Sequence, residues 1–215
     1  MSLRYRYQKY EIGNVDIRLQ ILRDLSQFSD TDGNMKAADI SQDAFPLFGI
    51  VWASSEVLAR LMRGYDITGK RILEVGCGMA LVSHLLNARG ADITAMDIRP
   101  IAGKLLSTNT DLNDASPIPY VNASWGDDSP GLGQFDLIVG SDILYEPKHV
   151  STLAPFLDKH ALVRSEVLIV DPNRGQSEVF EQAMSDIGFS CESYEPEFTD
   201  HLGVAYKGWV HRYFR

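Results

Sequence analysis

The sequence contains little cysteine and no grouping of histidines that suits a metal. Its two cysteines, Cys77 and Cys191, provide neither a disulfide framework nor a cysteine-rich metal site. The five histidines are scattered along the chain without the short spacings typical of zinc ligands. These absences predict a protein that needs no bound metal and whose fold is not stabilised by disulfides.

Long apolar runs and an excess of positive charge are also missing. No stretch approaches the roughly 20 apolar residues that a membrane-spanning helix needs. Residues 1–6 lack the apolar segment of a signal peptide, so we expect a cytoplasmic protein that does not enter a membrane. The formal net charge of −9 at pH 7 argues against a general affinity for nucleic acid backbones.

The composition that is present is typical of one globular α/β protein. The 215 residues are 45% hydrophobic and 23% charged, which allows a substantial core. We expect residues 1–66 to form an N-terminal extension packed on a core of residues 67–215. The extension is expected to contain a β-hairpin around Gly13-Asn14, a loop and a helix, at residues 5–12 and 15–22, 29–34, and 54–62.

After residue 66, short apolar runs alternate with amphipathic stretches. This rhythm predicts a Rossmann-like, doubly wound α/β fold with a mostly parallel sheet of seven strands. The last two runs lie close together and predict an antiparallel pair, with Trp209 in the core. The expected strands are residues 71–75, 92–96, 120–123, 135–140, 166–170, 189–194 and 204–213, and the expected helices are residues 80–88, 101–109, 149–158 and 177–187.

The most informative segment is a strand that runs into two glycines and then a helix. Gly76 permits a tight turn, and Gly78 lets a ligand approach the backbone where a side chain would block it. The next strand ends in Asp97, a position that suits a carboxylate accepting hydrogen bonds from both hydroxyls of an adenosine ribose. Together these residues predict a ligand that contains a nucleoside.

Two classes of ligand share this layout. A dinucleotide fingerprint requires a third glycine where this chain has Leu81, which would crowd a pyrophosphate. Glu74, two residues before the first glycine, suits the cationic end of S-adenosylmethionine better than a pyrophosphate. The pattern Glu74-x-Gly76-x-Gly78 resembles the first motif of class I S-adenosylmethionine-dependent methyltransferases. Many of them carry a further glycine where this chain has Ala80, the mildest replacement, and we expect the site to tolerate it.

A second informative segment follows the fourth expected core strand. Ligands of such sheets lie beyond the carboxyl ends of the strands, so Asp142, Tyr145 and Glu146 are placed to meet a substrate. The run from Asp142 to Tyr145 resembles the Asp-x-x-Tyr motif of the seven-strand protein-lysine methyltransferases. The resemblance implies that Ser141 lies at the methyl donor and that Asp142 and Tyr145 lie at the acceptor.

Three further segments carry this resemblance, which covers residues 45–190. One is the helix end with Asn109 and Asn113, which fits the family's Asn-rich helix end after the second strand. The stretch around Trp52 is similar to the tryptophan-bearing segment ahead of the family's first core helix. Ser124-Trp125-Gly126 is similar to the family's Trp-Gly pair and the residue before it, which lie beside the adenine of the donor. The resemblance implies that Trp52, Ser124 and Trp125 contact the donor. An acid often precedes the Trp-Gly pair, and Asp127 is a candidate substitute for it here.

The roles at the acceptor can be argued from chemistry. Methyl transfer from a sulfonium is an in-line displacement, so catalysis depends mainly on positioning and electrostatics. A lysine acceptor, with a reference pKa of about 10.4, must lose its proton before it attacks. Asp142 suits the holding and orienting of this amine, and Tyr145 suits its confinement. In the alternative interpretation, Asp142 caps the following segment and Tyr145 packs on the sheet edge.

We favour an N-methyltransferase that transfers a methyl group from S-adenosylmethionine to a lysine of a protein. A small-molecule methyltransferase acting on amines or pyridines stays open, as does a protein that binds the donor without catalysis. A dinucleotide oxidoreductase ranks last. Nucleic-acid amino methyltransferases usually place Pro-Pro-aromatic where this chain has Ile143-Leu144-Tyr145, so DNA and RNA are not expected substrates. Arg174 is interpreted as part of a plain loop, with contact to an acidic substrate as the alternative.

Overall fold

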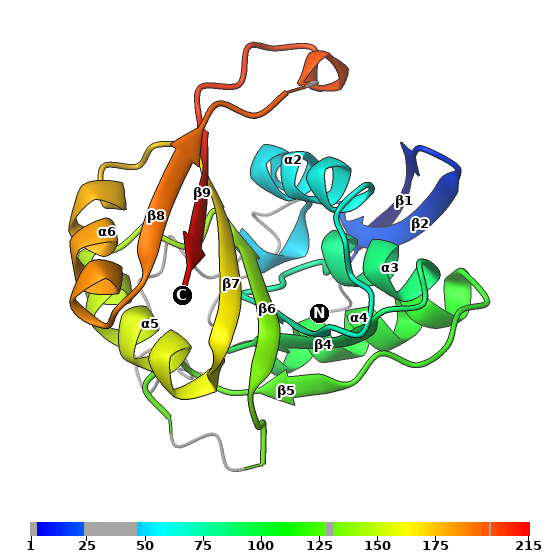
Figure 1. Ribbon diagram of the computed structural model, residues 1–215. Coiled ribbons are helices and arrows are strands. Elements are labelled where there is room, and N and C mark those ends of the chain that lie inside the picture. Colours follow the sequence, from blue (N-terminus) through cyan, green and yellow to red (C-terminus); the bar gives the residue numbers. More distant parts are fainter. Residues whose placement is uncertain (1–3, 24–46, 128–130, 198) are drawn as a thin grey trace.

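A computed structural model describes residues 4–23, 47–127, 131–197 and 199–215. Its seven-stranded sheet has the order β5-β4-β3-β6-β7-β9-β8, and β9 runs antiparallel to both of its neighbours (Figure 1). The predicted doubly wound sheet with an antiparallel C-terminal pair is therefore confirmed. The loop expected at residues 29–34 lies outside the described residues. The strands are β1 Tyr5–Ile12, β2 Val15–Leu22, β3 Arg71–Val75, β4 Asp92–Asp97, β5 Tyr120–Asn122, β6 Phe135–Ser141, β7 Ala161–Asp171, β8 Ser190–Tyr194 and β9 Trp209–Phe214.

Neighbouring residues of the central strands point to opposite faces of the sheet. Ile72 belongs to a core cluster with side chains of α2, α3 and α4, whereas Leu73 belongs to a second cluster with α5 and α6. Because both faces of the sheet are apolar, each face is covered by a layer of helices. In the part of the chain that is described, no helix has the length and apolarity needed to cross a membrane. The helices are α2 Ala53–Met62, α3 Leu81–Ala88, α4 Pro100–Leu112, α5 Pro147–His160 and α6 Ser177–Asp186.

The N-terminal hairpin is held against α4 by two asparagine side chains. The Asn109 amide accepts a hydrogen bond from the backbone N–H of Gln20 at 2.7 Å and donates to the carbonyl of Gln20 at 3.3 Å. Asn113 repeats this pairing with the backbone of Arg18, at 2.8 and 2.7 Å. Each amide therefore acts like a residue of a neighbouring strand toward β2. The division of the chain at residue 66 stays a prediction.

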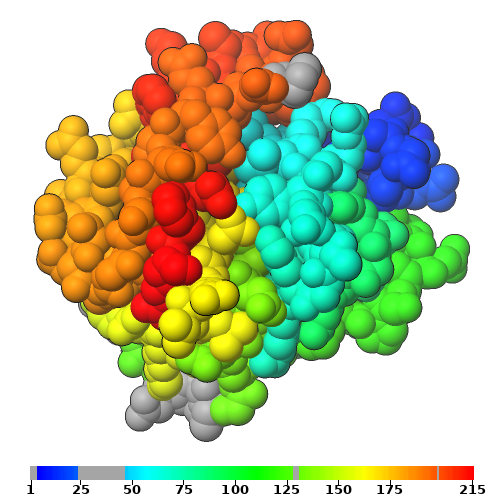
Figure 2. Space-filling model, in the orientation of Figure 1, coloured from blue at the N-terminus to red at the C-terminus, as the bar shows by residue number. Residues whose placement is uncertain are grey.

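The segment before β9 differs from the expectation. The last strand begins at Trp209, not at residue 204, because residues 204–208 run toward α2, where the Tyr206 hydroxyl lies 2.7 Å from Ser54 Oγ. Residues 199–208 include the short helix η3 (Asp200–Leu202), and they extend beyond the sheet beside α2 (Figures 1 and 2). Trp209 is 37% exposed, so the prediction that it lies in the core is wrong.

Candidate active site

A pocket of about 670 Å³ lies at the carboxyl ends of β3, β4 and β6. Strand β3 is the point at which the strand order reverses direction, and ligands of open α/β sheets bind at such a switch point. Within the described ranges, no group of three or more histidine, cysteine, aspartate or glutamate side chains is arranged to hold a metal ion. The predicted site residues that line the pocket are Trp52, Gly76, Gly78, Asp97, Ser124, Trp125, Ser141, Asp142, Tyr145 and Glu146.

The glycine loop between β3 and α3 needs glycine at both positions. Gly76 and Gly78 have φ angles of +63° and +51°, a left-handed conformation that other residues adopt only with strain. A Cβ atom on Gly78 would lie 3.3 Å from the carbonyl oxygen of Phe48, a backbone atom. The loop is fixed from below by Cys77, whose N–H donates to the Met96 carbonyl of β4 at 2.9 Å.

Ala80 occupies the position of the further glycine that related motifs carry. Its φ is +56° and its ψ is +36°, so this alanine is in the left-handed region directly before the first residue of α3. Its N–H donates to the Cys77 carbonyl at 2.6 Å, which closes the turn of the loop. The chain thus keeps the backbone geometry of the motif, at a strain of about 1 to 2 kcal/mol.

Asp97 connects the end of β4 to the glycine loop. Its carboxylate accepts hydrogen bonds from the Gly78 and Arg99 N–H groups, both at 2.9 Å. Burial raises the pKa of this carboxyl, and the two backbone donors oppose that rise. Each carboxylate oxygen still has a further lone pair, and the side chain borders the pocket. Asp97 is therefore placed to accept hydrogen bonds from a ligand.

Glu74 is not among the residues that line the pocket, and its part in donor binding stays a prediction. Its carboxylate lies beneath the glycine loop and accepts two hydrogen bonds from Ser83, one from the backbone N–H at 2.9 Å and one from the hydroxyl. The side chain is 1% exposed, and burial raises its pKa to about 7. Glu74 thus ties β3 to the first turn of α3 and supports the loop from below.

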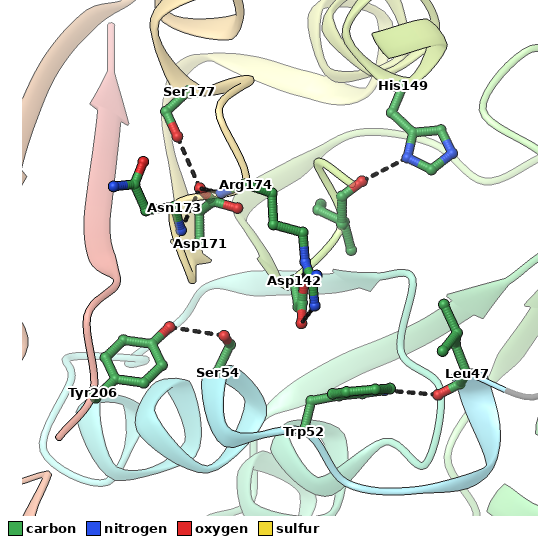
Figure 3. Close-up of polar contacts among 11 residues, drawn as sticks. Leu47, Trp52, Ser54, Asp142, His149, Asp171, Asn173, Arg174, Ser177 and Tyr206 are labelled. Atoms are coloured by element: carbon green, nitrogen blue, oxygen red, sulfur yellow. Dashed lines mark hydrogen bonds and ion pairs between the residues drawn. The ribbon is translucent and has the colours of Figure 1, made fainter. Parts of the chain in front are cut away.

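Trp125 and Trp52 form two walls of the pocket. Trp125 contacts the His149 ring edge-to-face, with 5.3 Å between the ring centroids. Trp52 is fixed by its indole N–H, which donates to the Leu47 carbonyl at 2.7 Å (Figure 3). Asp127 accepts a hydrogen bond from the Ser124 N–H at 2.7 Å, so it holds the turn before Trp125 and is not among the residues that line the pocket. We call Gly76, Gly78, Asp97 and Trp125 the donor half of the pocket.

Asp142 follows β6 in a strained backbone conformation. Its φ is +52°, and its N–H donates to the Val170 carbonyl of β7 at 2.9 Å. The carboxylate forms a bidentate ion pair with Arg174, at 2.5 Å to Nε and 2.8 Å to Nη2 (Figure 3). Arg174 is thus part of the site, although the sequence led us to interpret it as a plain loop residue. The pairing crosses from the end of β6 to the loop after β7, and no local motif indicates it.

Tyr145 and His149 form the other side of this region. Their rings meet edge-to-face with 4.5 Å between the centroids, and His149 Nδ1 lies 2.9 Å from the Ile143 carbonyl oxygen. Burial raises the pKa of Tyr145 to about 12 and lowers that of His149, so both side chains are neutral at pH 7. His149 lies four residues after Tyr145, in the first turn of α5, but no pattern in the sequence indicated it as a site residue. We call Asp142, Tyr145, His149 and Arg174 the acceptor half.

A sequence model of a family described as lysine methyltransferase (Methyltransf_16) matches residues 39–186. The chain belongs to this lysine methyltransferase family. The resemblance found in the Glu-x-Gly-x-Gly and Asp-x-x-Tyr motifs is therefore confirmed at the level of the family.

Curated relatives agree with this family. The chain is 31% identical over 143 residues to the electron transfer flavoprotein beta subunit lysine methyltransferase of Mus musculus, covering 65% of this chain and 55% of that protein. It is 33% identical over 104 residues to the protein N-lysine methyltransferase METTL21A of Danio rerio, covering 45% of this chain and 47% of that protein. The chain thus spans about half the length of the curated relatives it matches.

Solved structures of methyltransferases share the fold at low sequence identity. The 16S rRNA N2 G1207 methyltransferase of T. thermophilus, in complex with AdoMet and guanosine, has a TM-score of 0.66 and 13% identity. The comparison covers 100% of this chain and 51% of that one. The ribosomal protein L11 methylase of Lactobacillus delbrueckii subsp. bulgaricus has a TM-score of 0.57 and 20% identity, covering 75% and 78% of the two chains. These likenesses show the class I methyltransferase fold.

Proposed function

We propose that the protein transfers the methyl group of S-adenosylmethionine to the ε-amino group of a lysine in a protein. The observation that carries the proposal is the presence of the donor half and the acceptor half in one pocket. Membership of the lysine methyltransferase family supports it. Relatives named for protein-lysine methylation support the class of acceptor.

The donor half fits a ligand that contains adenosine. Gly78 presents its backbone to the pocket without a side chain, and Asp97 offers carboxylate lone pairs to the ribose hydroxyls. Trp125 offers an aromatic ring to the adenine. S-adenosylmethionine supplies a methyl group on a cationic sulfur, which is an electrophile that needs no metal.

The acceptor half fits an amine at the end of a long side chain. Asp142 offers a hydrogen-bond acceptor that orients the nitrogen, while the touching rings of Tyr145 and His149 form one aromatic wall for the alkyl chain. As the bond from nitrogen to the methyl carbon forms, the bond from sulfur to that carbon breaks. Only the neutral amine has a free electron pair for this attack, so the lysine ammonium must first lose one proton to water. The products are a methylammonium and S-adenosylhomocysteine, whose sulfur is neutral.

The test uses methyl-labelled S-adenosylmethionine with two sources of acceptor. One is purified electron transfer flavoprotein beta subunit, the protein named in the relatives, and the other is a cell lysate separated into proteins and small molecules. We expect label in a protein with the wild type and loss of that label with Asp142→Ala. The matched control is Asp158→Ala, which removes an aspartate paired with Arg215 at 2.6 Å outside the pocket.

Each result of this experiment has a definite meaning. Label in one protein band that disappears with Asp142→Ala and persists with Asp158→Ala supports protein methylation and identifies the acceptor. Label confined to the small molecules would overturn the protein acceptor in favour of a free amine. Donor binding without transfer in either sample would overturn catalysis. Action in the cytoplasm and the exclusion of nucleic acid stay predictions from the sequence.

A further inference from the structure

Asp142 and Arg174 form an ion pair in the acceptor half, and both residues line the pocket. The two side chains come from the ends of neighbouring strands, since Asp142 follows β6 and Arg174 follows β7. Both guanidinium contacts are short, and they engage both carboxylate oxygens. A bidentate pair of this kind is geometrically specific, unlike most surface ion pairs.

The loop that carries Arg174 is built to hold this position. The fully buried Asp171 accepts hydrogen bonds from the N–H of Asn173 at 3.0 Å, the N–H of Arg174 at 3.4 Å and the hydroxyl of Ser177 at 2.8 Å (Figure 3). Asn173 has a φ of +66° and Asp142 a φ of +52°, so the two loops that meet here are both strained. Strain of this kind persists where the surrounding structure fixes it, often at functional sites.

The charges around the pair decide which form of an amine the pocket favours. A lone carboxylate stabilises an ammonium, which cannot attack the methyl donor. Paired with Arg174, Asp142 belongs to a unit of zero net charge, and the exposed guanidinium repels an approaching cation. Burial raises the pKa of Tyr145, and of Tyr206 from the segment before β9, to about 12, so both phenols are neutral. Among the described residues, the other charged groups of the pocket and its surroundings are Asp97, Arg99, Glu146, Lys148 and Asp171.

We propose that Arg174 is a positioning residue that neutralises Asp142, so that the acceptor half holds the neutral, nucleophilic form of the lysine amine. This inference rests on the proposed function and deepens it. Arg174 acts through Asp142 and fixes the carboxylate as a hydrogen-bond acceptor instead of a counter-ion. Removing the guanidinium leaves a negative pocket in which the ammonium is the stable form.

The pH dependence of methyl transfer tests this role. With the acceptor protein, we expect Arg174→Gln to lower the rate about tenfold at pH 7.5, and the deficit to shrink to about twofold at pH 9.5. Arg174→Lys should retain the wild-type pH dependence because it keeps the positive charge. The double variant Asp142→Asn, Arg174→Gln should also retain it, because both charges are gone. A deficit of Arg174→Gln that is equal at all pH values would show a structural role and overturn the proposal.

A second measurement needs no acceptor protein. N-acetyl-lysine methylamide is titrated by NMR into the protein loaded with S-adenosylhomocysteine, at pH 7 and pH 9.5. We expect the wild type to bind this probe more tightly at pH 9.5 and Arg174→Gln to bind it more tightly at pH 7. Arg215→Gln, which breaks the pair with Asp158, should behave like the wild type. The same pH trend in all proteins, or no binding by any, would overturn the proposal. Failure of the proposed function would appear separately, as absent transfer by the wild type.

Discussion

The donor half and the acceptor half of the pocket are built in different ways. In the donor half, backbone groups and one buried carboxylate are joined by hydrogen bonds between neighbouring strand ends, as in the contact of Gly78 with Asp97. In the acceptor half, side chains of separate loops meet, as in the pair of Asp142 and Arg174. A site made from backbone suits a ligand that a whole family shares. A site made from side chains can change its substrate by replacing a few residues.

The largest expected effect concerns the backbone of the donor half. Gly78→Val should weaken S-adenosylmethionine binding about 1000-fold, because it adds left-handed strain and a contact with the Phe48 carbonyl oxygen. Isothermal titration calorimetry measures the dissociation constant. The control is Gly69→Ala, at a φ of +66° with no atom within 4 Å of the added Cβ, which should leave binding unchanged. Equal binding by Gly78→Val and the wild type would show that the ligand does not approach this loop.

A smaller effect is expected from the carboxyl beneath the loop. Because burial raises the pKa of Glu74 to about 7, the folded protein holds a proton that the unfolded chain loses near pH 4.5. The contribution of Glu74 to the free energy of unfolding should therefore fall as the pH rises from 4.5 to 7, by up to about 3 kcal/mol. Glu74→Gln removes this slope, so its stability should rise relative to the wild type across that range.

Urea unfolding at several pH values measures this difference. Glu11→Gln, a change at an exposed glutamate of the hairpin, should follow the wild-type curve at every pH. If the free energy of unfolding changes with pH in the same way for Glu74→Gln and the wild type, the pKa of the Glu74 carboxyl is not raised in the folded protein.

The smallest effect is expected at the turn that begins α3. Ala80→Gly should raise the free energy of unfolding by about 0.5 to 1 kcal/mol, because glycine adopts the left-handed conformation without strain. Ala183→Gly in α6 should lower it by about 1 kcal/mol, since glycine is unfavourable within a helix. Thermal unfolding compares the two variants. Destabilisation by both would mean that Ala80 is not strained.

The sequence predicted the donor half better than the acceptor half for a physical reason. Gly76, Gly78 and Asp97 belong to one strand-helix-strand unit, so spacing along the chain indicates their proximity. The sequence could not reveal that Arg174 reaches Asp142, because that contact depends on strand order and on the path of a loop.

The same distinction explains why the sequence did not reveal where the Glu74 side chain lies or that Trp209 is partly exposed. The Glu74 side chain points toward Ser83 and not toward the pocket. The spacing of residues along the chain does not determine this direction. The start of the last strand depends on the contact of Tyr206 with Ser54, a pair of residues far apart in the sequence. The hairpin followed from alternation and turn residues, and most core strands followed from short apolar runs, because those patterns are local.

The most direct test of the division into two halves compares Asp97→Asn with Asp142→Asn in two measurements, donor binding and methyl transfer. Asp97→Asn should raise the dissociation constant for S-adenosylmethionine about 10- to 100-fold, since it weakens charged hydrogen bonds. Asp142→Asn should leave that constant within about twofold and lower the rate at saturating donor by at least about 100-fold. Equal weakening of donor binding by both variants, or an unchanged rate with Asp142→Asn, would contradict the separation of donor and acceptor halves.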